Sequence, residues 1–325
     1  MKYIKLGNLE VSRIGLGTMG MSAYYTMGQQ NEQDSIRTIH RAIDLGVTLI
    51  DTAEIYGPYI NEELVGKALK GKRDKVVLAT KFGLISHTDG AIEGLNSQPS
   101  NVREAVEGSL KRLQTDYIDL YYQHRVDPNT PVEDTIGVLA DLIREGKIRH
   151  IGLSEAGVNT IRRAHKIHPI TALQSEYSLW SREPEAEILP VLRELGIGFV
   201  PYSPLGRGFL TGQITSQEQI ADDDFRKNSP RFSEENIAKN LQIIREVEKI
   251  ADELNAKPGQ VALAWLLAQG DYIAPIPGTK HVDRVEENIA ADHIDLNTNQ
   301  IQLLNNLTPA AGARYQEAYM GTIEK

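Results

Sequence analysis

Charged and polar side chains stand at the ends of several short apolar runs in this 325-residue sequence. Asp51 ends VTLID, Lys81 ends KVVLATK and His124 ends YIDLYYQH. A buried run is not expected to end in a charge unless that charge is paired or needed. If these runs are neighbouring strands, Asp51 and Lys81 form either a structural ion pair at the rim of a sheet or part of a catalytic group.

Tyr56 follows Asp51 in DTAEIYG, on a short loop that can return its hydroxyl over the strand ends. A phenol is a poor acid at neutral pH because its pKa is about 10. We expect the Lys81 ammonium to lower that pKa, Asp51 to keep the lysine charged, and His124 to hydrogen-bond the reacting oxygen. Such a group protonates a carbonyl oxygen. The hydride for the carbon must then come from a nicotinamide cofactor, because no side chain supplies one.

The elements that would position these side chains repeat along the chain. Continuous apolar runs, typical of parallel strands covered on both faces, alternate with amphipathic helical stretches such as DSIRTIHRAIDLG. Eight such repeats predict an α/β fold, a (β/α)8 TIM barrel, as a single domain over residues 1–325. The predicted strands are RIGLG, VTLID, KVVLATK, YIDLYYQH, IRHIGLS, ITALQSE, IGFVPYS and YIAPIPGT.

Two additions to the repeat are predicted. YIKLGNLEVS indicates an N-terminal β-hairpin around Gly7 and Asn8 that closes the barrel bottom. After strand 7 comes a long loop-helix insertion, which contains ENIAKNLQIIREVEKIADELN and is of the kind that shapes an active site. Within the repeat, Asn61 is the expected N-cap of NEELVGKALKG, and Pro190 is expected to kink EILPVLRELG or delay its start.

The composition limits the classes of function. The chain is 41% hydrophobic and 24% charged, with a formal charge of −9 and no basic run, so we expect no nucleic-acid partner. It has no cysteine, which excludes disulfide and thiolate chemistry. No stretch approaches about 18 apolar residues and the first residues lack a signal-peptide core, so we expect no membrane partner and a cytoplasmic location. His165 and His168 are interpreted as surface residues, and no metal site is predicted.

GLGTMG, from Gly15 to Gly20, matches the pattern G-x-G-x-x-G. We do not interpret it as a Rossmann fingerprint, because the following MSAYYTMGQQNEQ has no helical period and no acidic residue ends a second strand at the required spacing. Two interpretations of the glycines remain. They serve a turn at the barrel entry, or they let the backbone approach a ligand closely.

Several motifs, in the right order and over essentially the whole chain, resemble the aldo-keto reductase superfamily, and most of all its bacterial and plant branch ending in I-P-G-T/A. The resemblance implies an NADPH-dependent oxidoreductase of the alcohol dehydrogenase (NADP+) type that reduces small aldehydes or ketones. Tyr56 would donate the proton, Lys81 and Asp51 would tune it, and His124 would orient the carbonyl. The motifs are LGNLEVSRIGLGTMGMS, LIDTAEIYG, LATKFG, YYQHR, IGLSE, LQSEYSL, PYSPLGRGFLTG and IPGTKHVDRVEEN.

The resemblance also implies how NADP(H) is held. Ser154 and Gln174 would hold the nicotinamide carboxamide, Tyr202 would stack on the ring, and residues 203–208 would cover the pyrophosphate. The start of the last barrel helix would receive the 2′-phosphate and the adenine. The full predicted cofactor set is Gly17, Thr18, Met19, Asp51, Ser154, Gln174, Tyr202, Ser203, Leu205, Arg207, Gly208, Gly278, Thr279, Lys280, Arg284, Glu287 and Asn288.

Two positions depart from the family pattern. Glu155 stands where much of the superfamily has asparagine, and an ionised acid cannot donate to the carboxamide oxygen. Gly278 stands where the aldose reductase branch has a phosphate-binding lysine, for which Lys280 is the expected substitute.

The substrate pocket is predicted from aromatic residues near strand ends, with ordinary core packing as the alternative. Loops around 20–30, 82–100 and 204–235 are expected to select the substrate, whose identity the sequence leaves open together with the oligomeric state. A cofactor-retaining regulatory subunit and a Schiff-base enzyme using Lys81 are the alternative functions, the second disfavoured because Asp51 favours the charged amine. The predicted pocket residues are Tyr24, Phe82, Tyr177 and Trp180.

Overall fold

The computed structural model describes residues 1–25, 31–86 and 92–324, in which parallel strands form a barrel. Seven strands pair in one sheet, each parallel to its neighbours, which confirms the predicted α/β barrel. In spatial order they are β3 (Leu16–Gly17), β4 (Leu49–Asp51), β5 (Val77–Phe82), β8 (Ile118–Gln123), β9 (Ile148–Ser154), β10 (Ala172–Glu176) and β11 (Gly198–Tyr202).

The segment 272–278 closes the barrel between β11 and β3. It forms parallel bridges from Phe199 to Ile273 and from Gly17 to Gly278. Pro275 and Pro277 accept backbone hydrogen bonds from Gly15 and Gly17 of the β3 segment, but proline has no N–H to donate in return. The predicted eighth strand therefore fills its place in the barrel without forming a regular ladder.

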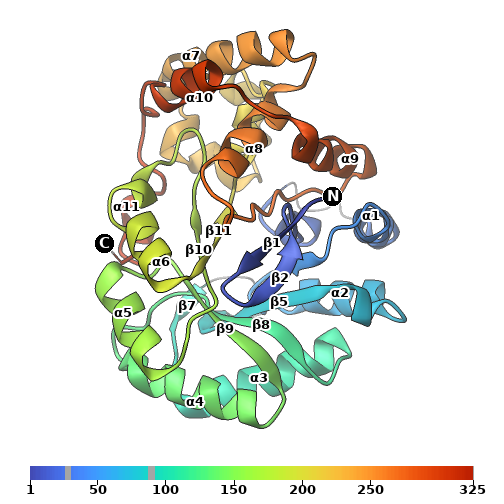
Figure 1. The fold of residues 1–325 in the computed structure, drawn as a ribbon, viewed down its shortest axis with the longest axis vertical. Coiled ribbons are helices and arrows are strands. Elements are labelled where there is room, and N and C mark those ends of the chain that lie inside the picture. Colours follow the sequence, from blue (N-terminus) through green and yellow to red (C-terminus); the bar gives the residue numbers. More distant parts are fainter. Residues whose placement is uncertain (26–30, 87–91, 325) are drawn as a thin grey trace.

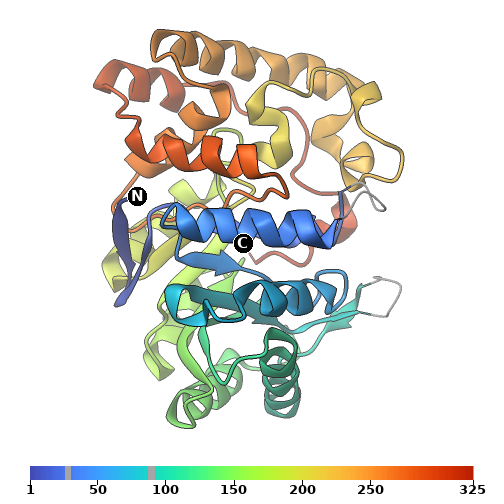
Figure 2. The ribbon, with the colours of Figure 1, turned by 90° about the vertical axis from the view of Figure 1, so that its right-hand side faces the viewer.

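Helices surround the strands (Figure 1). Helix α1 packs between α2 and α9, which completes the ring on the side where the chain returns to its start (Figure 2). Its N-cap is Asn31, whose side chain accepts hydrogen bonds from two backbone N–H groups of the first turn. The surrounding helices are α1 (Glu32–Asp44), α2 (Ile60–Leu69), α3 (Pro99–Leu113), α4 (Val132–Arg144), α5 (Val158–Ile167), α6 (Ile188–Leu195), α8 (Pro258–Ala268) and α9 (Val282–Ala290).

The predicted N-terminal hairpin plugs the barrel at the amino end of its strands. Strands β1 (Tyr3–Leu6) and β2 (Leu9–Ser12) pair antiparallel, and Leu6 and Leu9 join the apolar cluster inside the barrel. A Cβ added at Gly198 would lie 2.5 Å from the Leu6 backbone, so β11 and the hairpin are in close contact. The hairpin therefore leaves the carboxyl end of the strands as the end where a site can form.

The predicted insertion after β11 contains short 3₁₀ turns followed by α7 (Glu234–Glu253), which packs against α8. Helices α10 (Thr298–Asn305) and α11 (Glu317–Met320) follow the barrel, and Figure 1 shows α10 beside α7. In residues 1–25, 31–86 and 92–324, no helix combines the length and apolar character needed to span a bilayer.

Three local features differ from or refine the sequence predictions. An antiparallel pair, β6 (Leu84–Ser86) and β7 (Ile92–Leu95), follows β5 and was not predicted. The predicted N-cap role of Asn61 is wrong: α2 is capped at Tyr59, whose φ is +68°. The delayed start predicted for the helix containing Pro190 is confirmed, because α6 begins at Ile188 and leaves the proline in its first turn.

Asn61 is instead a buried residue of α2 that joins two loops. Its amide oxygen accepts from the hydroxyls of Thr18 (2.5 Å) and Thr52 (2.7 Å), and its amide nitrogen donates to the Thr18 carbonyl (2.9 Å) and the Ser22 hydroxyl (2.6 Å). These bonds fix the loops after β3 and β4, and the β4 loop is the one that carries Tyr56.

The glycines of GLGTMG have a packing role at the closure of the barrel. A Cβ on Gly15 would lie 2.9 Å from the Ile276 side chain, and one on Gly17 would lie 2.9 Å from the Ile276 carbonyl oxygen. The Ile276 carbonyl oxygen belongs to the backbone and cannot rotate away from an added Cβ as a side chain can. Gly17 is therefore required by the approach of β3 to the last strand segment, whatever else it contacts.

We expect Gly17→Ala to lower the free energy of unfolding by about 1–3 kcal/mol, as overpacking does. The matched control is Gly137→Ala in α4, where an added Cβ meets nothing within 4 Å. That variant should instead be about 0.5–1 kcal/mol more stable, because alanine favours a helix interior. Urea unfolding of both variants checks the pair, and equal stability changes would contradict the close-packing account.

Candidate active site

Asp51, Lys81 and Tyr56 meet at the carboxyl ends of β4 and β5. Asp51 pairs in register with Ala79, so Lys81, two residues further along β5, points into the barrel beside it. The Lys81 Nζ lies 2.5 Å from Asp51 Oδ1 and 3.1 Å from the Tyr56 hydroxyl. Lys81 is 0% exposed and Asp51 3%. The structure thus brings together three of the four predicted catalytic side chains by direct contact.

The hydrogen bonds of Lys81 identify it as an ammonium. Its Nζ donates to Asp51, to the Tyr56 hydroxyl and, at 2.8 Å, to the Thr52 carbonyl, which uses three N–H bonds. Burial lowers the pKa of Lys81 and raises that of Asp51, while their attraction opposes both shifts. Three acceptors around one nitrogen favour the ion pair. The arrangement therefore disfavours the neutral amine that a Schiff-base mechanism needs.

The Tyr56 hydroxyl accepts from Lys81, so its own proton is available to another acceptor. The predicted net lowering of the pKa of this phenol is wrong, because its pKa is raised in the folded protein. Burial raises the pKa of Tyr56 well above 10, the charge of Asp51 raises it further, and Arg125 only partly opposes them. Tyr56 is therefore a protonated phenol at neutral pH, which is the form a proton donor needs.

His124 lies beside Tyr56. Their rings meet edge to face, with centroids 6.0 Å apart. Burial lowers the pKa of His124 well below its usual value, and the charges of Arg125 and Lys81 lower it further, so the imidazole is neutral. Its buried Nδ1 has no hydrogen-bond partner among the described residues. A neutral ring next to a phenol can hydrogen-bond a substrate oxygen placed between them.

Gln174 and Ser154 complete the inner part of the site. Gln174 Nε2 donates to Asp51 Oδ2 at 2.8 Å, which fixes the amide and directs its carbonyl oxygen elsewhere. The Ser154 hydroxyl oxygen lies 3.2 Å from Arg125 Nη1, which donates to it, so the hydroxyl proton is free for a second acceptor. One donor and one acceptor at neighbouring strand ends match a primary carboxamide, which needs both.

Tyr202, Glu155 and the C-terminal segment form a second contact area. Arg314 donates to the Glu155 carboxylate and, at 2.5 Å, to the Tyr202 hydroxyl. Tyr315 shares a hydrogen bond of 3.0 Å with the same hydroxyl. The Glu155 carboxylate is thus committed to Arg314 rather than pointing at a carboxamide. Neither Arg314 nor Tyr315 was predicted, and no local sequence pattern links them to β9 or β11.

Arg207 and Ser203 lie in the segment predicted to cover a pyrophosphate. The Arg207 side chain is buried and donates to Glu176 at 3.0 Å, so only the backbone of this residue stays a predicted cofactor contact. The backbone is unusual here: Ser203 has a φ of +48° and Gly208 of +92°. Left-handed backbone of this kind turns N–H groups away from regular ladders, so the loop can still offer backbone donors to an anion.

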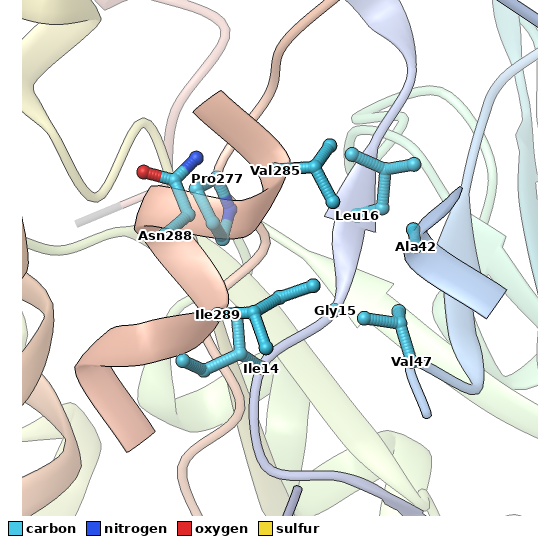
Figure 3. A pocket seen from close by; sticks show the side chains of 9 residues that line it. All are labelled: Ile14, Gly15, Leu16, Ala42, Val47, Pro277, Val285, Asn288 and Ile289. Atoms are coloured by element: carbon cyan, nitrogen blue, oxygen red, sulfur yellow. The ribbon is translucent and has the colours of Figure 1, made fainter. Parts of the chain in front are cut away.

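Helix α9 carries Arg284, Glu287 and Asn288, the residues predicted to contact the 2′-phosphate and the adenine. Val285 and Ile289 face Leu16 and α1 across a void of only about 10 Å³, too small for a ligand, while Asn288 lies at its rim (Figure 3). Arg284 Nη2 donates to Gln213 Oε1 at 2.7 Å, which ties the helix to the loop after β11.

The remaining predicted cofactor residues come from the loop after β3, the loop after β11, and the segment before α9 and α9 itself. Thr18 is buried and bonded to the Asp51 carbonyl at 2.8 Å, and Met19 packs against the cluster that contains Tyr56. The Thr279 hydroxyl accepts from the His281 backbone N–H at 3.1 Å, and the Lys280 carbonyl accepts from Thr38 at 3.0 Å. Leu205 and Glu287 both lie near Gly259, and Gly278 lies near Gly17.

Of the four predicted pocket residues, only Tyr24 lies beside the site, packed on the cluster with Tyr56. Phe82 is 0% exposed and packs on Tyr121, on the helix side of β5. Tyr177 is equally buried, against Phe199 and Trp265. Both pocket assignments are therefore corrected. Side-chain alternation gives the reason: Phe82 follows the inward Lys81 and must point outward.

The pocket assignment of Trp180 is corrected as well. Its ring is 3% exposed and stacks on Phe209, with centroids 4.7 Å apart, beneath the segment that follows β11. Parts of the predicted specificity loops, residues 26–30 and 87–91, lie outside the described residues. Within residues 1–25, 31–86 and 92–324, the hydrogen bonds of His165 and His168 are local, with the Ile170 N–H and the Pro169 carbonyl, respectively.

Arg125 is a site residue that the sequence analysis missed. It follows His124 directly, and its guanidinium donates to the His124 carbonyl at 2.7 Å and to Ser154 at 3.2 Å. The signal was present, because a charge at the end of a buried strand is the criterion that singled out Lys81. Its position between His124 and Ser154 places a cation at the barrel mouth.

Comparison with known proteins gives consistent matches over most of the chain. A model of the Aldo/keto reductase family matches residues 13–308. A protein of Glycine max named probable aldo-keto reductase 1 is 48% identical over 320 residues, which are 96% of this chain and 91% of the relative.

Solved structures agree with this match. A glycerol dehydrogenase from Gluconobacter oxydans has a TM-score of 0.85 and 31% identity, with 94% of each chain covered. An aldo/keto reductase from Klebsiella pneumoniae, solved in complex with NADP and acetate, has a TM-score of 0.76 and 27% identity, with 97% of this chain and 99% of that one covered.

Proposed function

The chain belongs to the aldo/keto reductase family, and from this premise we propose that it reduces aldehydes or ketones to alcohols with NADPH, with Tyr56 as the proton donor. The observation that carries the proposal is the contact of the Tyr56 hydroxyl with a buried ammonium on Lys81, 3.1 Å away, which is itself paired with Asp51. A protonated phenol with its proton free is the group that a carbonyl oxygen needs.

In the proposed reaction the protein binds and protonates the carbonyl. His124 and Tyr56 receive the carbonyl oxygen between them, and the phenol donates its proton to that oxygen as the carbon becomes tetrahedral. The Lys81 ammonium, 3.1 Å from the phenol oxygen, stabilises the negative charge that develops there. The bound nicotinamide supplies the hydride to the carbon.

The residues at the mouth fit a nicotinamide dinucleotide. Gln174 and Ser154 offer the acceptor and donor that a carboxamide requires. Arg284 near the start of α9 provides a cation for a 2′-phosphate, and the left-handed loop after β11 offers backbone donors to the pyrophosphate. The Klebsiella pneumoniae relative was solved with NADP, which supports NADP(H) as the cofactor.

The direct test is an NADPH-oxidation assay of the purified protein against a panel of aldehydes and ketones, with the alcohol product identified. We expect NADPH to be consumed in proportion to the alcohol formed. A protein that binds NADPH tightly but reduces nothing in the panel would favour the regulatory alternative, and one that binds no dinucleotide would contradict the proposal altogether.

We expect the maximal rate of carbonyl reduction to be nearly constant between about pH 6.5 and about pH 9. The pKa of Tyr56 is raised well above 10 and that of His124 lies well below 6.5, so neither group changes its charge in this interval. Alcohol oxidation needs the phenolate and should therefore accelerate with rising pH. Burial raises the pKa of Glu54, in the same loop as Tyr56, to about 7, so the control is Glu54→Gln. A reduction rate that falls with an apparent pKa near 7 in that variant would contradict the protonation states of Tyr56 and His124.

A further inference from the structure

The arginines at the barrel mouth differ in their partners. Arg207, Arg231 and Arg314 each lie within ion-pair distance of Glu176 or Glu155, and their charges are neutralised inside the protein. Arg125 differs from all three, because no carboxylate of the described residues lies within ion-pair distance of it.

The hydrogen bonds of Arg125 leave one edge of its guanidinium open. Both recorded bonds, to the His124 carbonyl at 2.7 Å and to the Ser154 hydroxyl at 3.2 Å, are donated by Nη1. Nη2 and Nε, which form the other edge, have no recorded partner among the described residues. Two parallel N–H groups on one planar edge match the two oxygens of a carboxylate.

The two hydrogen bonds of Nη1 fix the position of the guanidinium, and so the place where a ligand can bind to its Nε–Nη2 edge. Arg125 follows His124 in the chain and contacts Ser154, so its head group lies between the carbonyl-orienting and carboxamide-holding residues. The Glu155 carboxylate, whose charge raises the pKa of Arg125, is already paired with Arg314. The side chain is half-buried, and a cation withdrawn from water without a counter-ion costs free energy unless a ligand supplies one.

We propose that Arg125 binds a carboxylate of the substrate, so that the preferred substrates are aldehydes or ketones carrying a carboxylate near the carbonyl. This inference rests on the proposed reductase function and deepens it. The carboxylate would pair with the open Nε–Nη2 edge while the carbonyl oxygen lies between Tyr56 and His124. Arg125 thereby sets specificity and takes no part in proton transfer.

The test compares substrates of one shape that differ only in charge. The pairs are 4-carboxybenzaldehyde with 4-formylbenzamide and 3-carboxybenzaldehyde with 3-formylbenzamide, each assayed by NADPH oxidation. We expect kcat/KM for the carboxylate of at least one pair to exceed that of its amide about tenfold to a hundredfold, the range of one charge-assisted hydrogen-bonded contact. The excess should shrink as ionic strength rises.

Variants assign the preference to Arg125. Arg125→Gln should bring the ratio of carboxylate to amide close to one, and Arg125→Lys should keep part of it, because the charge remains but the planar edge is lost. Arg144→Gln is the matched control, since Arg144 is 72% exposed at the end of α4 and should leave the ratio as in the wild type.

The outcomes separate this inference from the function on which it rests. Reduction of both members of each pair with equal kcat/KM overturns the inference and leaves the reductase function standing. An equal loss for both members in Arg125→Gln, together with weaker NADPH binding, would show a positioning role through Ser154 and overturns it too. Failure to reduce any aldehyde overturns the proposed function and this inference with it. If Arg125→Gln does not fold, the inference is tested by the ratio of kcat/KM for the carboxylate and the amide in the wild type, by the salt dependence of that ratio, and by the ratio in Arg125→Lys.

Discussion

Replacing Tyr56 with phenylalanine is expected to lower kcat for carbonyl reduction by about a hundredfold to ten-thousandfold, the range of general acid catalysis. The substitution removes only the hydroxyl. The ring keeps its edge-to-face contact with His124, and Asp51 keeps its bonds to Lys81 and Gln174. The NADPH dissociation constant, measured by fluorescence titration, should therefore stay near the wild-type value.

The matched control is Tyr121→Phe, which also removes one phenolic oxygen from a buried ring. Tyr121 packs on Phe82 outside the barrel interior, so its loss should not change kcat. If Tyr56→Phe reduced carbonyls at the wild-type rate, the proton would come from another group, and the proposed mechanism would fail. A variant that lost NADPH binding as well would show that the tyrosine shapes the cofactor site instead.

Replacing Glu176 with glutamine is expected to lower the free energy of unfolding by about 3–5 kcal/mol, the usual effect of breaking a buried ion pair. Glu176 is 1% exposed and accepts from Arg207 and Arg314 at 3.0 Å each, with Arg231 at 3.5 Å. Glutamine keeps the shape but leaves buried guanidinium groups without their counter-ion. Urea unfolding measures the difference.

The decrease in the free energy of unfolding caused by Glu176→Gln should depend on pH, because the pKa of Glu176 is shifted in the folded protein. Burial alone would raise this pKa, but Arg207, Arg314 and Arg231 together lower it from 4.5 to about 2. Because the pKa of this carboxyl is lower in the folded protein than in the unfolded chain, its ionisation stabilises the fold at pH values above the unfolded-state pKa. This stabilisation is lost as the pH falls toward 2. The stability gap between wild type and Glu176→Gln should therefore narrow between pH 4.5 and about pH 2.

Glu235→Gln is the control for the loss of one carboxylate charge. Glu235 pairs with Lys239 on the exposed face of α7, with side chains 78% and 58% exposed, and its removal should not measurably change stability. If Glu176→Gln were as stable as the wild type, then Arg207, Arg231 and Arg314 would have found other partners. The anchoring of the C-terminal segment to β10 through Glu176 would then be wrong.

The sequence predicted those parts of the molecule that repeat or that end strands. The repeat of strands and helices, the hairpin and the insertion follow from local patterns of apolar residues. The structure contains seven of the eight predicted barrel strands, and the segment 272–278 takes the place of the eighth. Asp51 and Lys81 were found because a charge at the end of a buried strand has few structural explanations, and Tyr56 because it lies on the short loop after Asp51. That the whole chain forms a single domain stays a prediction.

What the sequence did not predict depends on side-chain direction and on distant contacts. Phe82 could have been excluded from the pocket by the alternation of side chains along β5. The pairing of Arg314 with Glu176 could not have been foreseen, because 138 residues separate them and Arg314 lies in no periodic pattern. The raised pKa of Tyr56 likewise depends on burial, which only the packed structure defines.

The most direct test of the reductase mechanism is the mass of the alcohol formed by the wild-type enzyme from NADPH that is deuterated at both C4 positions. If hydride passes from the nicotinamide to the carbonyl carbon while Tyr56 delivers an exchangeable proton to the oxygen, each product molecule carries one deuterium, bound to carbon. An alcohol that carries no deuterium would contradict the account.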